Sequence, residues 1–258
     1  MTDKLEKNPL LSTAKNALRI LNSFTLEAPE KRVSELAVEL GIGKSTISRL
    51  LSTLASEGYV IKDSDNQKYR LGLKILELNS IVSSQLEINR AARSVIKNLV
   101  KETGEAAVIA ILEDEVVDIE QIERSHPEPI LTYIGSRSPV HCTSSGKLLL
   151  AYHEQAKLHH VLERGLTPYT LNTVTDPHLL RKQLAGIRES GFCYCESEHL
   201  ENVASFSAPI RNYSNIVVAA ITLIGPLHRI HQLSFTGLKS KVIKAAKEIS
   251  KNLGYYGL

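Results

Sequence analysis

Apolar residues recur at steps of three and four in two runs within residues 33–58, the spacing of one buried face on each of two helices. They are Val33, Leu36, Ala37 and Leu40 in the first run, and Ile47, Leu50, Leu51, Leu54 and Ala55 in the second. Gly41 and Gly43 interrupt the pattern, and glycine tolerates the backbone angles of a tight corner. Ser45 is a suitable N-cap for the second helix. Two short helices joined by a glycine-bearing turn are typical of a helix-turn-helix.

The second helix of this pair carries cationic and hydroxyl side chains away from its apolar face. These outward residues are Lys44, Ser45, Thr46, Ser48, Arg49 and Ser52. Arginine and lysine bind guanine edges or phosphates, and hydroxyls hydrogen-bond to either group. The pattern therefore favours a recognition helix that lies in the major groove of a double-stranded DNA operator. The alternative is a surface helix in a fold unrelated to DNA.

Segments on both sides of the helix pair predict a winged helix-turn-helix domain over residues 1–72. The predicted elements are a helix over 14–24 and two strands, over 59–61 and 68–71, around a polar turn. We expect Lys62, Lys68 and Tyr69 on this hairpin to contact the phosphate backbone or the minor groove.

The remaining pattern predicts a linker helix over 73–90 and a second domain over 91–258. Apolar residues of the linker spread beyond one stripe, so we expect it to support dimerisation as well. Further helices are predicted over 92–103, 146–152, 156–162, 177–188 and 238–253, and strands over 105–112, 116–122, 130–134, 192–196, 204–210 and 216–224. Asp176-Pro177 is a cap and first-turn signal for the helix that follows it. Interleaved helices and strands indicate an α/β (α+β) fold.

Composition narrows the class of protein. The 258 residues are 43% hydrophobic and 23% charged, which is ordinary for a globular protein, and the net charge of +3 is only faintly basic. Three cysteines are too few for a disulfide framework. No apolar run approaches the roughly 20 residues that span a bilayer, and the N-terminus lacks the apolar core of a signal peptide. We therefore expect a cytoplasmic protein with no membrane partner.

Ser144-Ser145-Gly146-Lys147 contains the Ser-x-x-Lys pattern of some acyl-transfer enzymes, in which a lysine activates the serine. The companion motifs Lys-Thr-Gly and Ser-Asp-Asn do not occur in the chain. Hydroxyls and backbone amides at a helix start are instead a ready site for a small anion. A Ser-Lys enzyme and a purely structural turn are the alternatives to that reading.

Two further patterns are weak. Gly43-Lys44-Ser45 resembles the end of a phosphate-binding loop, but the required earlier glycine is replaced by Val38. Cys193, Cys195 and His199 match no common zinc spacing, and the two cysteines point the same way on a predicted strand. We therefore expect neither a metal nor a cofactor.

Taken together, these stretches resemble the IclR family of bacterial transcriptional regulators over nearly the full length of the chain. The matching segments are Ala17–Leu21, Leu36-Ala37, Gly43–Leu51, Glu57–Val60, Tyr69–Gly72, His141–Ala151, Gly191–Glu198, Ala208–Ile210 and Val217–Pro226. Their order and spacing make the resemblance specific.

The resemblance implies a winged helix-turn-helix, a linker helix and a GAF-like effector domain. It also implies homodimers, commonly paired into tetramers, that bind pseudo-palindromic operators as repressors or activators. Small organic acids or aromatic metabolites would bind in the second domain. Carried over by position, the effector pocket comprises Ser144, Ser145, Cys195, Ser205, Thr222 and Ile224, with Leu131 and Ile134 as an apolar wall.

Several of these positions depart from the family pattern. Cys195 stands where relatives often have aspartate, Ser205 where many have cysteine, and Ile224 where serine is frequent. Fewer polar groups favour a ligand that is less hydroxylated than a sugar acid. The alternative is a pocket that is partly lost, which would leave a DNA-binding dimer with no small-molecule effector.

Overall fold

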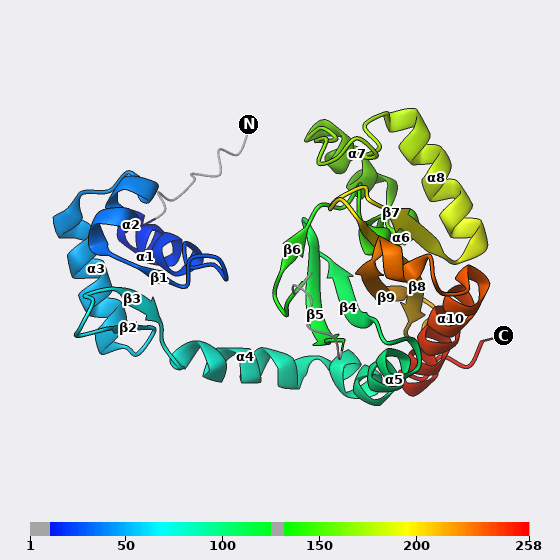
Figure 1. The fold of residues 1–258 in the computed structure, drawn as a ribbon, viewed down its shortest axis with the longest axis horizontal. Coiled ribbons are helices and arrows are strands. Elements are labelled where there is room, and N and C mark those ends of the chain that lie inside the picture. Colours follow the sequence, from blue (N-terminus) through cyan, green and yellow to red (C-terminus); the bar gives the residue numbers. More distant parts are fainter. Residues whose placement is uncertain (1–10, 125–131, 258) are drawn as a thin grey trace, which may run out of the picture. The chain divides into compact units, whose positions relative to one another are not determined.

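The computed structural model describes residues 11–124 and 132–257, and the chain divides into two compact units. Unit 1 is Met1–Gln85 and unit 2 is Leu86–Leu258. Their helices and strands are labelled in Figure 1. Among the described residues, no helix is both long enough and apolar enough to cross a membrane.

Unit 1 is a helical domain with a small sheet. Its elements are α1 (Ser12–Asn22), β1 (Glu30–Lys31), α2 (Val33–Leu40), α3 (Lys44–Ser56), β2 (Val60–Lys62), β3 (Tyr69–Leu71) and α4 (Lys74–Gln85). The three helices α1 to α3 pack around Ile20, Leu36, Ile47 and Leu51, which have no exposed surface. The apolar spacing predicted this core, because the buried residues of α3 all come from its apolar stripe.

The turn between α2 and α3 needs only one of its two glycines. Gly41 has a φ of 66°, in the left-handed region that favours glycine, whereas Gly43 has an ordinary φ of −59°. The prediction that Ser45 caps α3 is wrong. The helix begins at Lys44, because the carbonyl of Gly43 already accepts hydrogen bonds from the amides of Thr46 and Ile47.

The hairpin after α3 is part of a three-stranded antiparallel sheet in the order β1-β3-β2. The strand β1, of two residues, is too short to leave a pattern in the sequence. The hairpin turn is held by the carboxylate of Asp63, which accepts hydrogen bonds from the amides of Asp65 and Asn66. The strand β1 lies between α1 and α2 in the chain and pairs with β3, so it joins the hairpin to the helices of unit 1.

Unit 2 contains six strands and six helices among its described residues. They are α5 (Glu87–Thr103), β4 (Ala106–Leu112), β5 (Val116–Ile122), β6 (Arg137–Ser138), α6 (Ser144–Tyr152), α7 (Gln155–Glu163), α8 (Pro177–Ser190), β7 (Cys193–Glu196), β8 (Val203–Arg211), β9 (Val217–Pro226), α9 (Leu227–Ile230) and α10 (Phe235–Asn252). The strands form one antiparallel sheet in the order β6-β5-β4-β9-β8-β7. The prediction of a mixed α/β domain is confirmed.

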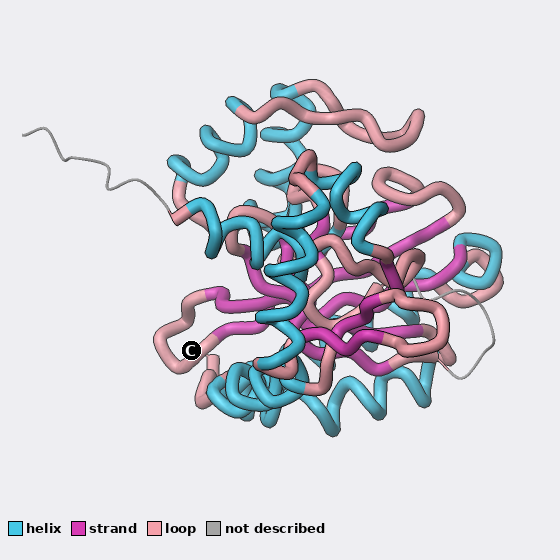
Figure 2. The backbone as a smooth tube through the Cα atoms, turned by 90° about the vertical axis from the view of Figure 1, so that its left-hand side faces the viewer, coloured by secondary structure: helices cyan, strands magenta, loops and turns pink. Residues whose placement is uncertain are grey.

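The sheet lies between two layers of helices, as the backbone traces show (Figures 1 and 2). One face packs against α5 and α10, and its core includes Ile109, Phe206 and Ile221. The other face packs against α6, α7 and α8, and its core includes Leu148, Leu180 and Cys193. The cap predicted at Asp176 is confirmed, since its carboxylate accepts a hydrogen bond from the amide of His178.

The strand predicted over 130–134 is wrong for the part that the structure describes. Residues 132–134 form no strand; they lead into a turn in which the amide of Ser136 donates to the carbonyl of Tyr133. Gly135 allows this turn with a φ of 88°. The edge strand is instead β6, which pairs with Val116 and Val117 of β5. Residues 130 and 131 lie outside the described part of the chain.

Candidate functional site

The outer face of α3 is a polar surface. All six residues of α3 that the sequence assigns to DNA are exposed on this face, while the opposite face is buried in the core of unit 1. They are Lys44, Ser45, Thr46, Ser48, Arg49 and Ser52. The Ser52 hydroxyl donates to the carbonyl of Ser48, which leaves its lone pairs on the surface of the helix. The face therefore presents two cations and four hydroxyl groups.

The hairpin contributes two lysines and not the predicted tyrosine. Lys62 is exposed and Lys68 is half-buried at the start of the return strand. The ring of Tyr69 is only 6% exposed and belongs to the core of unit 1, so its side chain has no surface with which to contact DNA. Its ring lies 5.8 Å from the ammonium of Lys62, which it helps to position. The assignment of Tyr69 to the DNA surface is therefore corrected.

A second candidate site lies at the N-terminus of α6 in unit 2. The hydroxyl of Thr143 caps this helix by accepting a hydrogen bond from the amide of Gly146. The following amides, those of Ser144 and Ser145, are the first two of the helix and have no partner within it. Both serines are buried, so the positive end of the helix points into the protein.

The sheet register brings four of the predicted pocket residues together. Cys195 of β7 lies directly opposite Ser205 of β8, and Ser205 lies directly opposite Ile224 of β9. Thr222 is two residues before Ile224 and therefore on the same face of the sheet. Three consecutive strands, β7, β8 and β9, thus present one row of side chains beneath the start of α6.

Hydroxyl groups connect the helix to this row. Ser144 donates a hydrogen bond to the hydroxyl of Ser205 at 2.8 Å and lies 2.7 Å from the hydroxyl of Ser207. Ser207 is in turn 2.7 Å from the hydroxyl of Thr222. A chain of four hydroxyls therefore runs from α6 across β8 to β9, and hydroxyls can rotate to donate or accept.

Three of these four residues, Ser144, Ser205 and Thr222, line a cavity of about 80 Å³. Its lining residues include all six that the sequence places at the helix start and on the strands: Ser144, Ser145, Cys195, Ser205, Thr222 and Ile224. Ile134 is not part of the lining and is 48% exposed, because the turn at residues 133–136 directs it outward. Leu131 lies outside the residues that the structure describes.

Two carboxylates also line the cavity, and neither was predicted from the sequence as a pocket residue. Asp118 accepts hydrogen bonds from Thr132 and from Ser136, the latter at 2.7 Å. Burial raises the pKa of its carboxyl above the ordinary value, although these two bonds act in the opposite direction. The sequence does contain a signal for Asp118, because it is a charged residue inside the predicted apolar strand 116–122.

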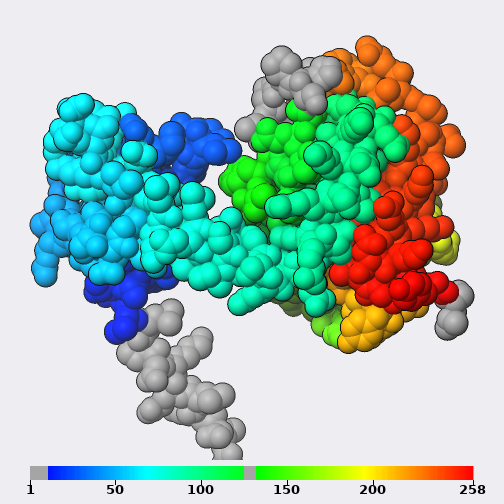
Figure 3. Space-filling view, turned by 90° about the horizontal axis from the view of Figure 1, so that it is seen from below, coloured from blue at the N-terminus to red at the C-terminus, as the bar shows by residue number. Residues whose placement is uncertain are grey.

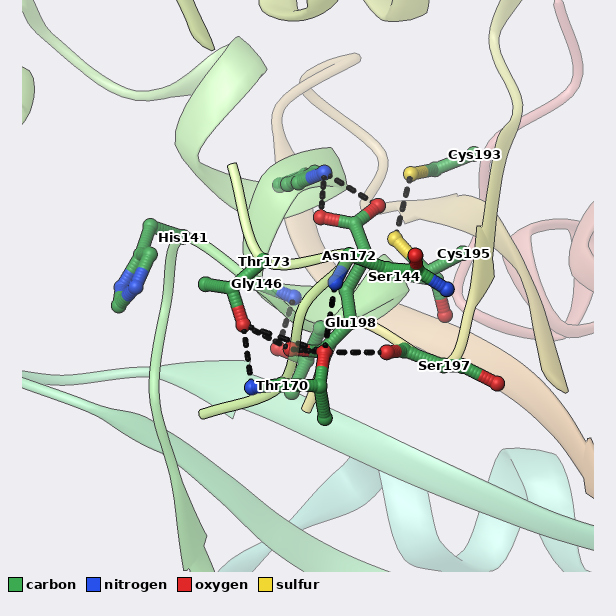
Figure 4. A network of polar contacts seen from close by, with 12 residues as sticks. His141, Ser144, Gly146, Thr170, Asn172, Thr173, Cys193, Cys195, Ser197 and Glu198 are labelled. Carbon is green, nitrogen blue, oxygen red and sulfur yellow. Dashed lines mark hydrogen bonds and ion pairs between the residues drawn. The ribbon is translucent and has the colours of Figure 1, made fainter. Parts of the chain in front are cut away.

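The second carboxylate is Glu198, which pairs with Lys147 one turn into α6. The ammonium lies 2.7 Å from Oε1 of the carboxylate and contacts its other oxygen too, and the lysine is only 2% exposed. The backbone of Glu198 is held by the hydroxyl of Thr173, which donates to its carbonyl (Figure 4). An ammonium held in this ion pair is not available as the base of a Ser-Lys enzyme.

Burial shifts the pKa of one thiol and two imidazoles near the cavity in the direction that favours their neutral forms. Burial raises the pKa of Cys142 to about 12, and burial lowers the pKa of both His141 and His199. The sulfur atoms of Cys193 and Cys195 lie 3.9 Å apart on one face of β7, as the strand pattern predicts. Within the described residues, no three histidine, cysteine or acidic side chains are arranged to hold a metal ion.

Both units match domains of a known protein family. Residues 13–64 match the model of the IclR helix-turn-helix domain, and residues 81–251 match that of the C-terminal domain of the bacterial transcriptional regulator IclR. The transcriptional regulator XynR of Escherichia coli is 31% identical over 249 residues, which cover 96% of this chain and 99% of the relative. The transcriptional repressor IclR of the same organism is 30% identical, over 88% of this chain and 83% of the relative.

A solved structure shows the same fold with a ligand. The IclR homologue of Microbacterium hydrocarbonoxydans in complex with 4-hydroxybenzoate superposes with a TM-score of 0.83 and 26% identity, over 94% of this chain and 99% of the homologue. These relatives are regulators of transcription and not enzymes. This chain belongs to the IclR family of bacterial transcriptional regulators.

Proposed function

We propose that this regulator binds an operator through α3 and the hairpin, and that a compact organic acid in unit 2 controls this binding. The exposed cations and hydroxyls of α3 supply both base contacts and phosphate contacts. A ligand that binds one arrangement of the reading heads more tightly shifts the population toward it, and operator affinity changes accordingly. Such a protein would work in the cytoplasm, where the chromosome is.

The homodimer that an operator with two half-sites requires is supported by α4. None of the residues of α4 is buried, and five large apolar side chains in and just before it are exposed. They are Leu73, Leu76, Leu78, Ile81 and Val82. An exposed apolar helix of this kind is stabilised by a second copy, which would pair two recognition helices for adjacent major grooves. We propose the homodimer, or a tetramer built from two of them, as the DNA-binding form.

The observation that carries the choice of effector is the cavity at the N-terminus of α6. Two helix-start amides and the hydroxyls of Ser144, Ser145 and Thr222 face a space of about 80 Å³. Helix-start amides favour a carboxylate. Pockets for drug-sized ligands measure about 300–1,000 Å³, so this one suits an acid with only a few non-hydrogen atoms. A compact carboxylic acid fits better than an aromatic one of the size of 4-hydroxybenzoate.

A thermal-shift series with the full chain tests this proposal. Acetate, pyruvate, succinate and 4-hydroxybenzoate form a panel of increasing size, and a ligand that binds only the folded state must raise the melting temperature. We expect the rise with a compact acid and its loss in Ser144→Ala. If no acid raises the melting temperature while operator binding persists, the protein is a DNA-binding dimer without a small-molecule effector.

A further inference from the structure

Unit 2 has a second cavity, which is separate from the proposed effector site. It has a volume of about 750 Å³ and lies between α10, the residues that follow α10, and the ends of α6, α8 and β8. Figure 3 shows this end of the unit, where α10 and the C-terminal residues are coloured red. Its lining residues have no member in common with the residues that line the cavity at the start of α6. Its volume falls within the range of sites for small-molecule ligands.

The charge of this cavity has one sign. Arg211, Lys247 and Lys251 line it, and the described residues of its lining include no aspartate or glutamate. Lys247 and Lys251 are one turn apart on α10, so their ammonium groups share a face of the helix. Three cations without a compensating carboxylate in the lining favour a ligand with two or more negative charges.

Arg211 is held in place before any ligand arrives. Its guanidinium donates to the carbonyl of Asn215 at 2.9 Å and lies 5.0 Å from the ring centroid of Tyr152. The backbone amide of Arg211 donates to the hydroxyl of Ser250, and this hydrogen bond joins the end of β8 to α10. These partners are neutral, so the guanidinium is oriented while its charge stays uncompensated by them. A planar guanidinium fixed in this way suits the oxygens of a phosphate group.

The cavity also has aromatic walls. Tyr152, Tyr255 and Tyr256 line it, and Tyr256 is 78% exposed at its rim. A planar ring can stack on tyrosine whichever polar groups it carries, so stacking adds affinity without requiring a particular hydrogen-bond pattern. The combination of fixed cations and tyrosine rings favours an anion that carries a planar ring.

We propose that this cavity is a second ligand site and that it binds a nucleotide, with its phosphates on Arg211, Lys247 and Lys251 and its base against the C-terminal tyrosines. The site is formed by unit 2 alone, so it does not depend on the proposed effector or on DNA. A nucleotide site would give a function to the basic face of α10 and to the tyrosines after it, which belong neither to the DNA surface nor to the proposed effector cavity.

Isothermal titration of the full chain with magnesium-free ATP tests the proposal, with tripolyphosphate and adenosine as separate probes. We expect saturable binding of ATP at one site per chain, weaker binding of tripolyphosphate and the weakest binding of adenosine. The double variant Lys247→Gln/Lys251→Gln should weaken ATP binding by about tenfold or more. Tyr256→Ala should weaken ATP binding about fivefold and leave tripolyphosphate binding unchanged.

A charge-matched control separates the site from general attraction to a basic protein. Lys97→Gln/Lys244→Gln removes two exposed cations from α5 and α10, outside the cavity lining, and should keep the affinity for ATP. Arg49→Ala should keep it as well, because that residue belongs to the DNA surface. The proposal is overturned if ATP does not bind at millimolar concentration, or if either control loses as much affinity as the cavity variant.

Discussion

The ammonium of Lys147 and the carboxylate of Glu198 form a buried ion pair that joins α6 to the loop after β7. The ammonium lies 2.7 Å from Oε1 and 2.5 Å from Oε2 of the carboxylate, and the hydroxyl of Thr173 donates to the carbonyl of Glu198 at 2.6 Å. Glu198 lines the proposed effector cavity while Lys147 lies behind it, with 2% of its surface exposed. The pair therefore fixes a wall of the cavity and keeps its carboxylate neutralised.

Lys147→Met should destabilise the protein by about 3–5 kcal/mol, because it leaves the carboxylate of Glu198 buried without its partner. Differential scanning calorimetry of the full chain measures the loss. In the double variant Lys147→Met/Glu198→Leu most of the stability should return, since two apolar side chains replace the pair. A loss below about 1 kcal/mol for Lys147→Met would show that the pair is solvated and does not hold the wall.

Gly146→Ala should destabilise the start of α6 by roughly 1–3 kcal/mol and abolish the response to effector. A Cβ atom at this position would overlap the carbonyl oxygen of Val140 and lie 2.6 Å from the hydroxyl of Thr143, which caps the helix. Urea unfolding and thermal shift with the acid panel measure the two effects.

Gly186→Ala is the matched control for this substitution. Gly186 is in the middle of α8, and a Cβ atom there would meet no other atom within 4 Å. Alanine is a better helix former than glycine, so this change should stabilise the protein by about 0.5–1 kcal/mol. If Gly146→Ala instead stabilises the protein as much as Gly186→Ala does, helix propensity, and not the close approach of Val140, decides the result.

The parts of the fold that the sequence predicts well are those in which apolar spacing is regular. The stripe on α3 and the cap at Asp176 are examples, and the row of Cys195, Ser205 and Ile224 follows from the family resemblance. The start of α5 was predicted five residues late. Asn89 is a buried polar residue there that donates to the carbonyl of Ile119, and an asparagine interrupts an apolar stripe.

The parts that it does not predict depend on partners that are distant in the chain. Ser-x-x-Lys resembles a catalytic pair until Glu198, 51 residues after Lys147, is seen to hold the ammonium. Tyr69 stands on a hairpin beside lysines. The strand that holds it, β3, also pairs with β1, and the ring of Tyr69 lies inside the core. Spacing along a chain reports which face a residue occupies, but not which residue from elsewhere covers that face.

Stability should fall as the pH decreases below about 6.5, because the buried imidazoles bind protons less readily than in the unfolded chain. Burial lowers the pKa of His141 and His199, so below the ordinary value of 6.5 the unfolded chain takes up protons that the folded chain does not. The stability present above that pH is therefore lost progressively down to the lowered pKa. Urea unfolding between about pH 7.5 and 5.5 measures the slope.

His141→Gln should make this slope shallower and keep the fold. An amide can replace the hydrogen bond of Nε2 to the carbonyl of Thr167, which is 2.9 Å long, without binding a proton. Asp118, whose pKa is raised, contributes a slope of the opposite sign, and comparison with the wild type removes it. His178→Gln, at an exposed position, is the control. An unchanged slope in His141→Gln would show that folding leaves the pKa of His141 unchanged.

Arg49→Ala and Lys44→Ala should affect operator binding in different ways if α3 lies in the major groove. A duplex selected from a random pool by the wild-type protein serves as the probe. Loss of an arginine that contacts a base should cost about 1–3 kcal/mol and relax specificity at one position. Loss of a lysine that contacts phosphate should weaken all sequences alike and reduce the slope of log affinity against log salt by about 0.9. Arg181→Ala removes the same charge from an exposed position on α8 and should change neither quantity. If Arg49→Ala behaves like this control, the outer face of α3 does not read DNA.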